Sequence, residues 1–243
     1  MRNTILYIVM FFVAATSYAQ QTLWAVGTAV PEGKRALSAR PDGRYLLTGT
    51  LKKGKLYFCE TGNISSPGQF CAPVMPDASL LTDGTPYKAT TNAKEAVWAV
   101  AIDADNYKLV IDPRKSSLSG CLCVDWVEMY IVGGCTAPGQ GKWEMSCIIP
   151  FHPVDGQPYV WQCECMLNKD YLNTEPDRFK IIGQRGWTPK HLHPYAMDEQ
   201  TAETHPFYMG GIDHKWAITQ SGNYRITVNL LHETIKVELL SQN

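Results

Sequence analysis

The chain has 243 residues, of which 45% are hydrophobic and 19% are charged, and this length is enough for about two domains of ordinary size. Those proportions are typical of a globular protein, so they exclude a disordered or fibrous chain. The formal net charge is −1, and no basic face is evident in the sequence. These features argue against nucleic acid as a partner.

The N-terminus predicts a secretory signal peptide over residues 1–19. Arg2 supplies the positive start, residues 5–15 form an apolar run, and Ser17 and Ala19 are small residues before a cleavage site. No later run is long and apolar enough to cross a bilayer, so we expect no transmembrane segment in the mature chain. The first cysteine is Cys59, so we expect no lipid-anchor cysteine after the signal peptide.

The first half of the mature chain contains short apolar runs bounded by Gly, Pro and Asn, a pattern that predicts β-strands. The expected strands there are residues 23–27, 45–51, 56–58, 96–102 and 107–111. We expect the last two to pair as a hairpin, residues 28–42 to form loop and turn, and most of residues 60–92 to form loop. No stretch has helical periodicity, which favours an all-β protein.

One hairpin pattern occurs twice. Residues 106–112 (NYKLVID) return as residues 223–229 (NYRITVN), and each copy alternates apolar and polar side chains as a half-buried strand does. In the second copy a new alternation begins at Ile235, which predicts the returning strand of an antiparallel hairpin. The sequence therefore predicts two tandem immunoglobulin-like antiparallel β-sandwich domains, at residues 20–122 and 123–243.

All eight cysteines lie in the mature chain. An even count in an exported chain suggests disulfides, with Cys59/Cys71 and Cys135/Cys147 as plausible local pairs. The spacing leaves the connectivity open, and two alternatives remain. Two Cys-x-Cys pairs, at residues 121–123 and 163–165, offer four thiolates for zinc, or the thiols are ordinary buried residues.

A longer pattern runs through the second copy in a fixed order. It consists of Tyr130-x-Val-Gly, Ala137-Pro138, Trp143, Asp155-Gly156-x-x-Tyr159, Phe179-Lys180, Gly186-Trp187 and Asn223-Tyr224. This order resembles the repeats of the SusE/SusF family, outer-membrane starch-binding proteins of Gram-negative glycan-uptake systems. The resemblance covers most of residues 127–240 and, more faintly, residues 23–118.

The resemblance implies small carbohydrate-binding-module-like sandwiches that hold an α-glucan without transforming it or using a cofactor. It implies a location at the cell envelope, periplasmic or associated with the outer membrane. The implied partners are a polysaccharide or oligosaccharide and other outer-membrane glycan-uptake proteins. A structural or adhesive module that binds a protein partner is the alternative hypothesis.

The candidate glycan-binding residues lie in the second copy. By the resemblance, Trp143 and Trp187 provide flat rings for the apolar face of a pyranose, and the polar side chains that follow Trp187 bond its hydroxyls. Those polar candidates are Lys190, His191, His193 and Tyr195. Core packing is the alternative for each Trp, and a metal is the alternative for the His-x-His pair. In the first copy Lys34 and Arg35 stand at the position of Trp143, so we interpret that copy as degenerate.

The strand context of Trp98 and Trp216 predicts that both pack in the core. No sequence motif supports an enzyme. The chain contains no Gly-x-Ser-x-Gly, no phosphate-binding loop and no His-Glu-x-x-His. We therefore expect a non-catalytic binding protein with no cofactor and no metal.

Overall fold

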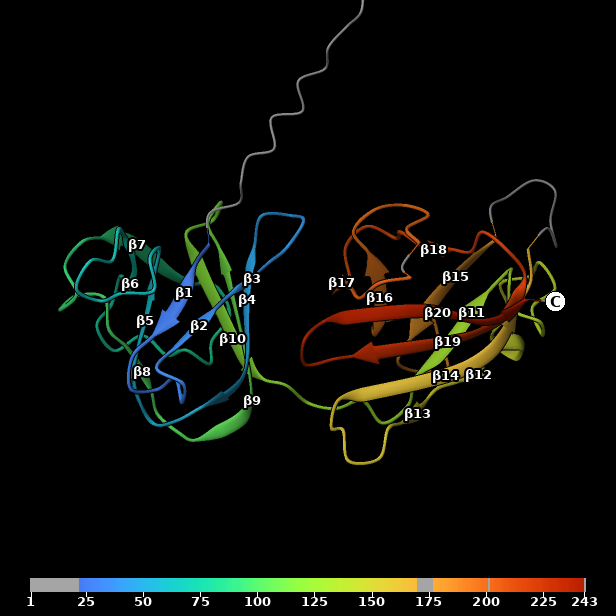
Figure 1. The fold of residues 1–243 in the computed structure, drawn as a ribbon, viewed down its shortest axis with the longest axis horizontal. Helices are drawn as coiled ribbons and strands as arrows, with labels where there is room; N and C mark the ends of the chain where they lie inside the picture. Colours follow the sequence, from blue (N-terminus) through green and yellow to red (C-terminus); the bar gives the residue numbers. More distant parts are fainter. Residues whose placement is uncertain (1–21, 170–176, 201, 243) are drawn as a thin grey trace, which may run out of the picture.

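The computed structural model describes residues 22–169, 177–200 and 202–242, and none of these residues lies in an α-helix. Two ten-stranded antiparallel sheets, each curled into nearly a barrel, form two tandem β-sandwich domains (Figure 1). The predicted all-β fold with two sandwiches is confirmed. The expected signal peptide at residues 1–19 lies outside the described residues. Within the described ranges, no helix has the length and apolar character needed to cross a membrane.

The two domains have the same topology. The first contains β1 Trp24–Val26, β2 Lys34–Ala36, β3 Ser38–Ala39, β4 Tyr45–Leu51, β5 Gly54–Cys59, β6 Phe70–Pro73, β7 Thr85–Thr90, β8 Trp98–Val100, β9 Ala104–Asp112 and β10 Ser117–Leu122. The second contains β11 Tyr130–Gly133, the 3-10 helix η1 Met145–Cys147, β12 Ile149–Pro150, β13 His152–Pro153, β14 Val160–Leu167, β15 Arg178–Ile182, β16 His191–Pro194, β17 His205–Met209, β18 Trp216–Ala217, β19 Gly222–Asn229 and β20 Thr234–Gln242.

The hydrogen-bonded strand order is β2-β1-β5-β6-β7-β10-β9-β4-β3 in the first domain, with β8 added on β5. In the second it is β12-β11-β15-β16-β17-β20-β19-β14-β13, with β18 added on β15. Each strand of the first domain therefore has its counterpart at the same place in the second. The strand registers then define equivalent positions in the two domains, residue by residue.

The repeated hairpin forms as predicted in both domains. In β19 the side chains of Tyr224, Ile226 and Val228 are buried, and β20 pairs with the strand along its length. In the first domain β9 pairs with β10 in the same way. Trp98 and Trp216 occupy equivalent positions beside β5 and β15 and are each 1% exposed, so their predicted place in the core is confirmed.

One strand in each domain passes from one layer of the sandwich to the other. In β7 residues 87–90 pair with β6, while Pro86 and Thr85 pair with β10. Strand β17 does the same, with Pro206 at the position of Pro86. Because proline has no N–H to donate, it suits a point where the hydrogen-bonded ladder is interrupted. This shared corner joins the two layers of each sandwich.

A shared glycine stands at the end of the first strand of each domain, directly after β1 and as the last residue of β11. A Cβ on Gly27 would collide with the carbonyl oxygen of Lys55, and one on Gly133 would collide with the carbonyl oxygen of Arg178. The two carbonyls belong to equivalent residues of β5 and β15. A side chain is therefore excluded at both places, and the repeated Val-Gly of the sequence has a direct structural cause.

Two expectations about the first domain were wrong and a third was incomplete. Most of residues 60–92 is loop as expected, but the range also contains β6 and β7. Residues 28–42, expected as loop and turn, contain β2 and β3. These strands escaped prediction because they are short and their burial does not alternate over a useful length. The expected hairpin between residues 96–102 and 107–111 does not form, since β8 pairs with β5 and β9 pairs with β4 and β10. The expectation assumed that two strands consecutive in the chain also pair in the sheet, and β8 and β9 do not.

The two domains contact each other through the turn between β19 and β20 (Figure 1). Lys108 of β9 forms an ion pair with Glu233 at 2.5 Å, and the two side chains are only 8% and 12% exposed. Arg40 donates to the backbone oxygen of His232 at 2.6 Å, and Thr48 lies 2.6 Å from the Nδ1 of His232. These contacts fix the second domain's turn against β4 and β9 of the first.

Candidate functional site

The candidate site lies on the outer face of the layer formed by β11, β15, β16 and β17. Side chains alternate along each strand, so Phe179, Ile181 and Leu192 face the core while Lys180 and His193 face outward. The segment before η1, which carries Trp143, and the loop at residues 210–215 are joined to this face by the contacts described next. Sequence reasoning expected exposed residues on this face, whereas several are covered.

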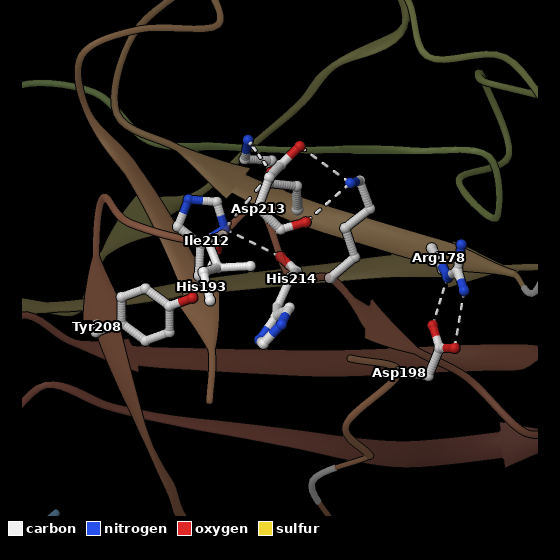
Figure 2. A network of polar contacts seen from close by, with 9 residues as sticks. Arg178, His193, Asp198, Tyr208, Ile212, Asp213 and His214 are labelled. Carbon is white, nitrogen blue, oxygen red and sulfur yellow. Dashed lines mark hydrogen bonds and ion pairs between the residues drawn. The ribbon is translucent and has the colours of Figure 1, made fainter. Parts of the chain in front are cut away.

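Asp213 is the centre of the polar contacts on this face (Figure 2). Its carboxylate accepts hydrogen bonds from Lys180 Nζ at 2.6 Å and from Lys215 Nζ at 3.0 Å. Partial burial acts to raise the pKa of Asp213, but the bonds from the two lysines outweigh it and lower that pKa to about 2. The carboxylate is therefore ionised at neutral pH, and it holds the loop at residues 210–215 on β15.

His193 supports this loop from below and does not reach solvent. Its side chain is 0% exposed, and its Nδ1 lies 3.0 Å from the backbone oxygen of His214, so the nitrogen donates its proton there. Burial lowers the pKa of His193, which keeps the ring neutral. The expectation that His193 bonds a bound sugar is therefore wrong for this conformation, because the sheet and the loop enclose the ring. Its Nε2 has no hydrogen-bond partner among the described residues.

A row of rings leads from His193 towards the first domain. His191 lies 4.5 Å from His193, Tyr208 lies 5.5 Å from His193, and Tyr195 lies 5.1 Å from Tyr208, measured between ring centroids. Arg44 of the first domain reaches the Tyr195 hydroxyl at 3.4 Å. His191 and Tyr195 are half-buried, so both candidates keep an exposed edge, and Tyr195 lies at the junction of the domains.

Trp143 and Trp187 stand on different loops. Trp143 is half-buried, with Lys215 Nζ 5.7 Å from its ring centroid, so it belongs to the cluster around Asp213. Trp187 is 42% exposed in the loop between β15 and β16, and no ring contact joins it to Trp143 in the described part of the chain. Lys190 has an exposed side chain in the same loop, and its backbone N–H donates to Gln184. The structure therefore brings Trp143 together with the polar cluster and leaves Trp187 with Lys190.

Sequence reasoning missed Lys180, Tyr208, Asp213 and Lys215 as members of the cluster. Lys180 had a usable signal, because a lysine between Phe179 and Ile181 in a strand must face away from the core. Asp213 and Lys215 had none, since a loop of a fold without helices is placed only by tertiary contacts. Tyr208 lies on β17, and its place beside His193 follows from the pairing of β17 with β16, which the sequence does not show. Arg178 and Asp198 form a two-pronged ion pair close by, which anchors the chain that follows Tyr195 (Figure 2).

The thiols and histidines do not form a metal site in the described residues, where no group of three or more potential ligands comes together. All eight cysteines are free. The suggested Cys59/Cys71 pair is contradicted, because Cys59 packs in the outer cluster of the first domain while Cys71 packs against its core. Cys135 and Cys147 are likewise unpaired, and the two Cys-x-Cys sets remain separate thiols.

Comparison with known proteins does not assign the chain to a family. No protein-family model matches the chain, and no curated protein matches it. Among solved structures, the chain is similar to the crystal structure of SusF from Bacteroides thetaiotaomicron, with 12% identity and a TM-score of 0.40 over 91% of this chain. The aligned region is 49% of SusF, so the chain spans about half the length of that protein. A likeness of this size does not carry a function across.

Proposed function

We propose that this chain is an exported, non-catalytic carbohydrate-binding protein of the Gram-negative cell envelope, resembling the SusE/SusF family. Its ligand is a starch-like α-glucan or a related polysaccharide, held by the second domain. The associated partners are other outer-membrane glycan-uptake proteins. The first domain then supports the second rather than repeating its glycan site.

The observation that carries the proposal is the 42% exposure of Trp187 in a polar loop. A large flat ring that reaches solvent is available to stack on the apolar face of a ligand, and burying it there would gain free energy. Lys190 lies three positions further on in the same loop, with its side chain exposed. An exposed ring beside a cation suits one pyranose face and its hydroxyls.

The second contact region is the cluster around Trp143. Lys215 and the exposed side chain of Asp213 offer a donor and an acceptor close to this ring, and His191 adds a half-buried imidazole. Burial lowers the pKa of His191, so its ring is neutral and provides both a donor and an acceptor at neutral pH. One ring contact contributes about 1 kcal/mol, so retention on a long polymer requires several contacts or several sites.

Affinity electrophoresis tests the proposal. The mature protein is run in gels cast with starch, pullulan, dextran and a β-glucan. We expect retardation by an α-glucan, reversal by soluble maltooligosaccharide, and loss of retardation in Trp187→Ala. Trp216→Ala is unsuitable as a control because it damages the core, so Met209→Ala, an exposed position on β17, serves instead. Unchanged mobility of the wild type in all four gels overturns the proposal.

A protein-binding module is the second candidate. Met197, Met209 and Ile212 are 45%, 48% and 67% exposed, and they come from β17 and the loops that flank it. Exposed apolar side chains gathered in one part of a surface are typical of protein contact sites. The two functions separate in a pull-down with soluble maltooligosaccharide added, since sugar competes for a glycan site and leaves a protein contact intact.

A further inference from the structure

The first domain contains a pocket of about 310 Å³ at one end of its sandwich. Leu23 and Ile111, buried residues of the domain core, line its inner part. Exposed residues of the β5–β6 loop, β7 and the β9–β10 turn form its rim, so the pocket opens to solvent. These rim residues are Gln69, Ala89, Pro113 and Ser116. Ligand sites commonly lie in the mouths of barrel-like β folds, and this volume is at the small end of their range.

The same place in the second domain is filled. Strand register makes Trp161 the counterpart of Tyr45, because each pairs with the equivalent residue of β9 or β19. Register likewise makes Leu192 the counterpart of Cys71. Trp161 is 5% exposed and Leu192 is 0% exposed in the second domain's core, whereas Tyr45 and Cys71 are half-buried and line the pocket.

Two further positions follow the same pattern. Phe207, 0% exposed, is the counterpart of Tyr87, a residue that lines the pocket. Glu60 stands where the second domain has Gly183, a residue so tightly covered by Trp126 that a Cβ there would collide with the indole. The first domain has thus replaced apolar core filling with two phenols, a thiol and a carboxylate around an open space.

The walls of the pocket define what it accepts. Burial raises the pKa of the Cys71 thiol to about 11 and also raises the pKa values of Tyr45 and Tyr87, so all three groups stay protonated at neutral pH. The thiol of Cys71 and the hydroxyl of Tyr87 are neighbouring polar groups of the pocket wall. Glu60 accepts the backbone N–H of Gln69 at 2.9 Å at the rim. No Lys, Arg or His is among the described residues that line the pocket, so nothing there compensates an anion.

We propose that the first domain binds a small uncharged ring compound that carries hydroxyl groups at its edge, in this pocket. The ring packs on Leu23 and Ile111, and its hydroxyls bond to the phenols of Tyr45 and Tyr87 and to Glu60. The site is separate from the glycan face proposed for the second domain and uses none of its residues. A saturated sugar ring and a phenolic ring share this chemistry, and the experiment below distinguishes them.

Ligand-observed NMR on the mature two-domain chain tests the site, with methyl α-D-glucopyranoside as the saturated probe and resorcinol as the aromatic one. We expect at least one probe to bind with a Kd below about 10 mM, a realistic affinity for so few atoms. Benzoate, an anion with a ring of similar size, should bind at least tenfold more weakly. The probe that binds identifies the kind of ring.

Two variants locate the binding. Cys71→Leu combined with Tyr87→Phe copies the packing of the second domain and should reduce binding at least tenfold. Ala89→Trp blocks the rim from an exposed position and should do the same without disturbing the core, so the test survives poor folding of the double variant. Met209→Trp, at the equivalent exposed position of β17, is the matched control and should bind as the wild type does.

Three results overturn the proposal. They are failure of both probes to bind the wild type, binding that survives both pocket variants, and benzoate binding as tightly as the neutral probes. The comparison of the pocket variants is made in a Trp143→Ala, Trp187→Ala background, in which glucoside bound by the second domain's proposed glycan face does not contribute and binding in the pocket should persist. Loss of polysaccharide retention in that background concerns the second domain alone, so the two proposals fail independently.

Discussion

The two domains share strand order, core tryptophans and the proline corner, yet they differ in two equivalent places. On the outer face, the second domain has Lys180 and His193, while register places Tyr57 and Ala72 there in the first domain. The outer cluster of the first domain is accordingly apolar, and it consists of Val26, Cys59, Phe70, Ala72 and Ala96. The polar cluster around Asp213 is thus a feature of one copy only.

The end of the sandwich shows the reverse difference. In the second domain this end is filled by side chains. The turn between β19 and β20 contacts the first domain through Glu233 and His232. In the first domain the equivalent turn rims an open pocket. The comparison teaches that a repeated β-sandwich keeps its framework residues while its faces diverge, so a site found in one copy does not predict a site in the other.

The largest expected loss of stability comes from the core tryptophans that the two domains share. Trp98→Ala and Trp216→Ala each remove a 1%-exposed indole from an equivalent core position. Each should lower the free energy of unfolding of its own domain by about 3–5 kcal/mol, the range for buried aromatic truncation. Urea unfolding, followed by hydrogen exchange of peptides from each domain, measures the losses separately. A loss below about 1 kcal/mol in either domain would show that the two cores are not equivalent.

Among the shared features, the repeated hairpin and the core tryptophans are the ones that the sequence predicted. Strong alternation at residues 223–229 and the two strand tryptophans were sufficient, because period-two burial is a local property of a strand. Strands β6 and β7 were missed since their partners lie in other segments and their own pattern is weak. For the candidate site, exposure of Trp187 followed from its glycine-rich loop. The burial of His193 did not, because the covering loop is placed by Asp213 from a distant segment.

The next largest effect concerns the ion pair between Lys108 and Glu233 at the junction of the two domains. Glu233→Gln leaves the ammonium of Lys108 without its partner in a contact where both side chains are nearly buried. Removing one member of a buried pair should destabilise the protein by about 3 kcal/mol. Thermal unfolding measures this, with Glu238→Gln as the control, since the Lys236–Glu238 pair is 38% and 35% exposed and is expected to contribute less than about 1 kcal/mol.

The double variant Lys108→Met with Glu233→Leu sharpens the same point. Replacing both charges with apolar side chains of similar size should restore most of the lost stability, because the cost arises from an unpaired buried charge. Equal losses in the single and double variants would instead mean that the ion pair itself, rather than its burial, joins the domains.

Acid should affect the two domains unequally. All six histidines lie in the second copy, and burial lowers the pKa values of His191, His193 and His232. Protons then bind the unfolded chain more tightly than the folded one, so this stability is complete above about pH 6.5 and falls as the pH drops below that value. Hydrogen exchange at pH 7.5 and pH 5.5 should show faster opening of the second domain in acid, once intrinsic rates are corrected.

A substitution isolates one of these histidines. His232→Asn removes the ring from the domain junction and should reduce the acid sensitivity of the turn between β19 and β20, while leaving the sensitivity around His193 in place. Equal acid destabilisation of both domains would contradict this account, since the first copy has no histidine to titrate.

The smallest expected change in stability is that of Trp187→Ala, which removes the ring on which the proposed function rests. Trp187 is 42% exposed, and its loop is held by backbone contacts from Gly183 and Lys190 rather than by the indole. Trp187→Ala should therefore change the free energy of unfolding by less than about 0.5 kcal/mol, as exposed substitutions usually do. Set against the loss expected for Trp216→Ala, this difference separates a tryptophan kept for a ligand from one kept for the core. A loss above about 2 kcal/mol, measured by urea unfolding, would place Trp187 with the core and remove the main support for a glycan site.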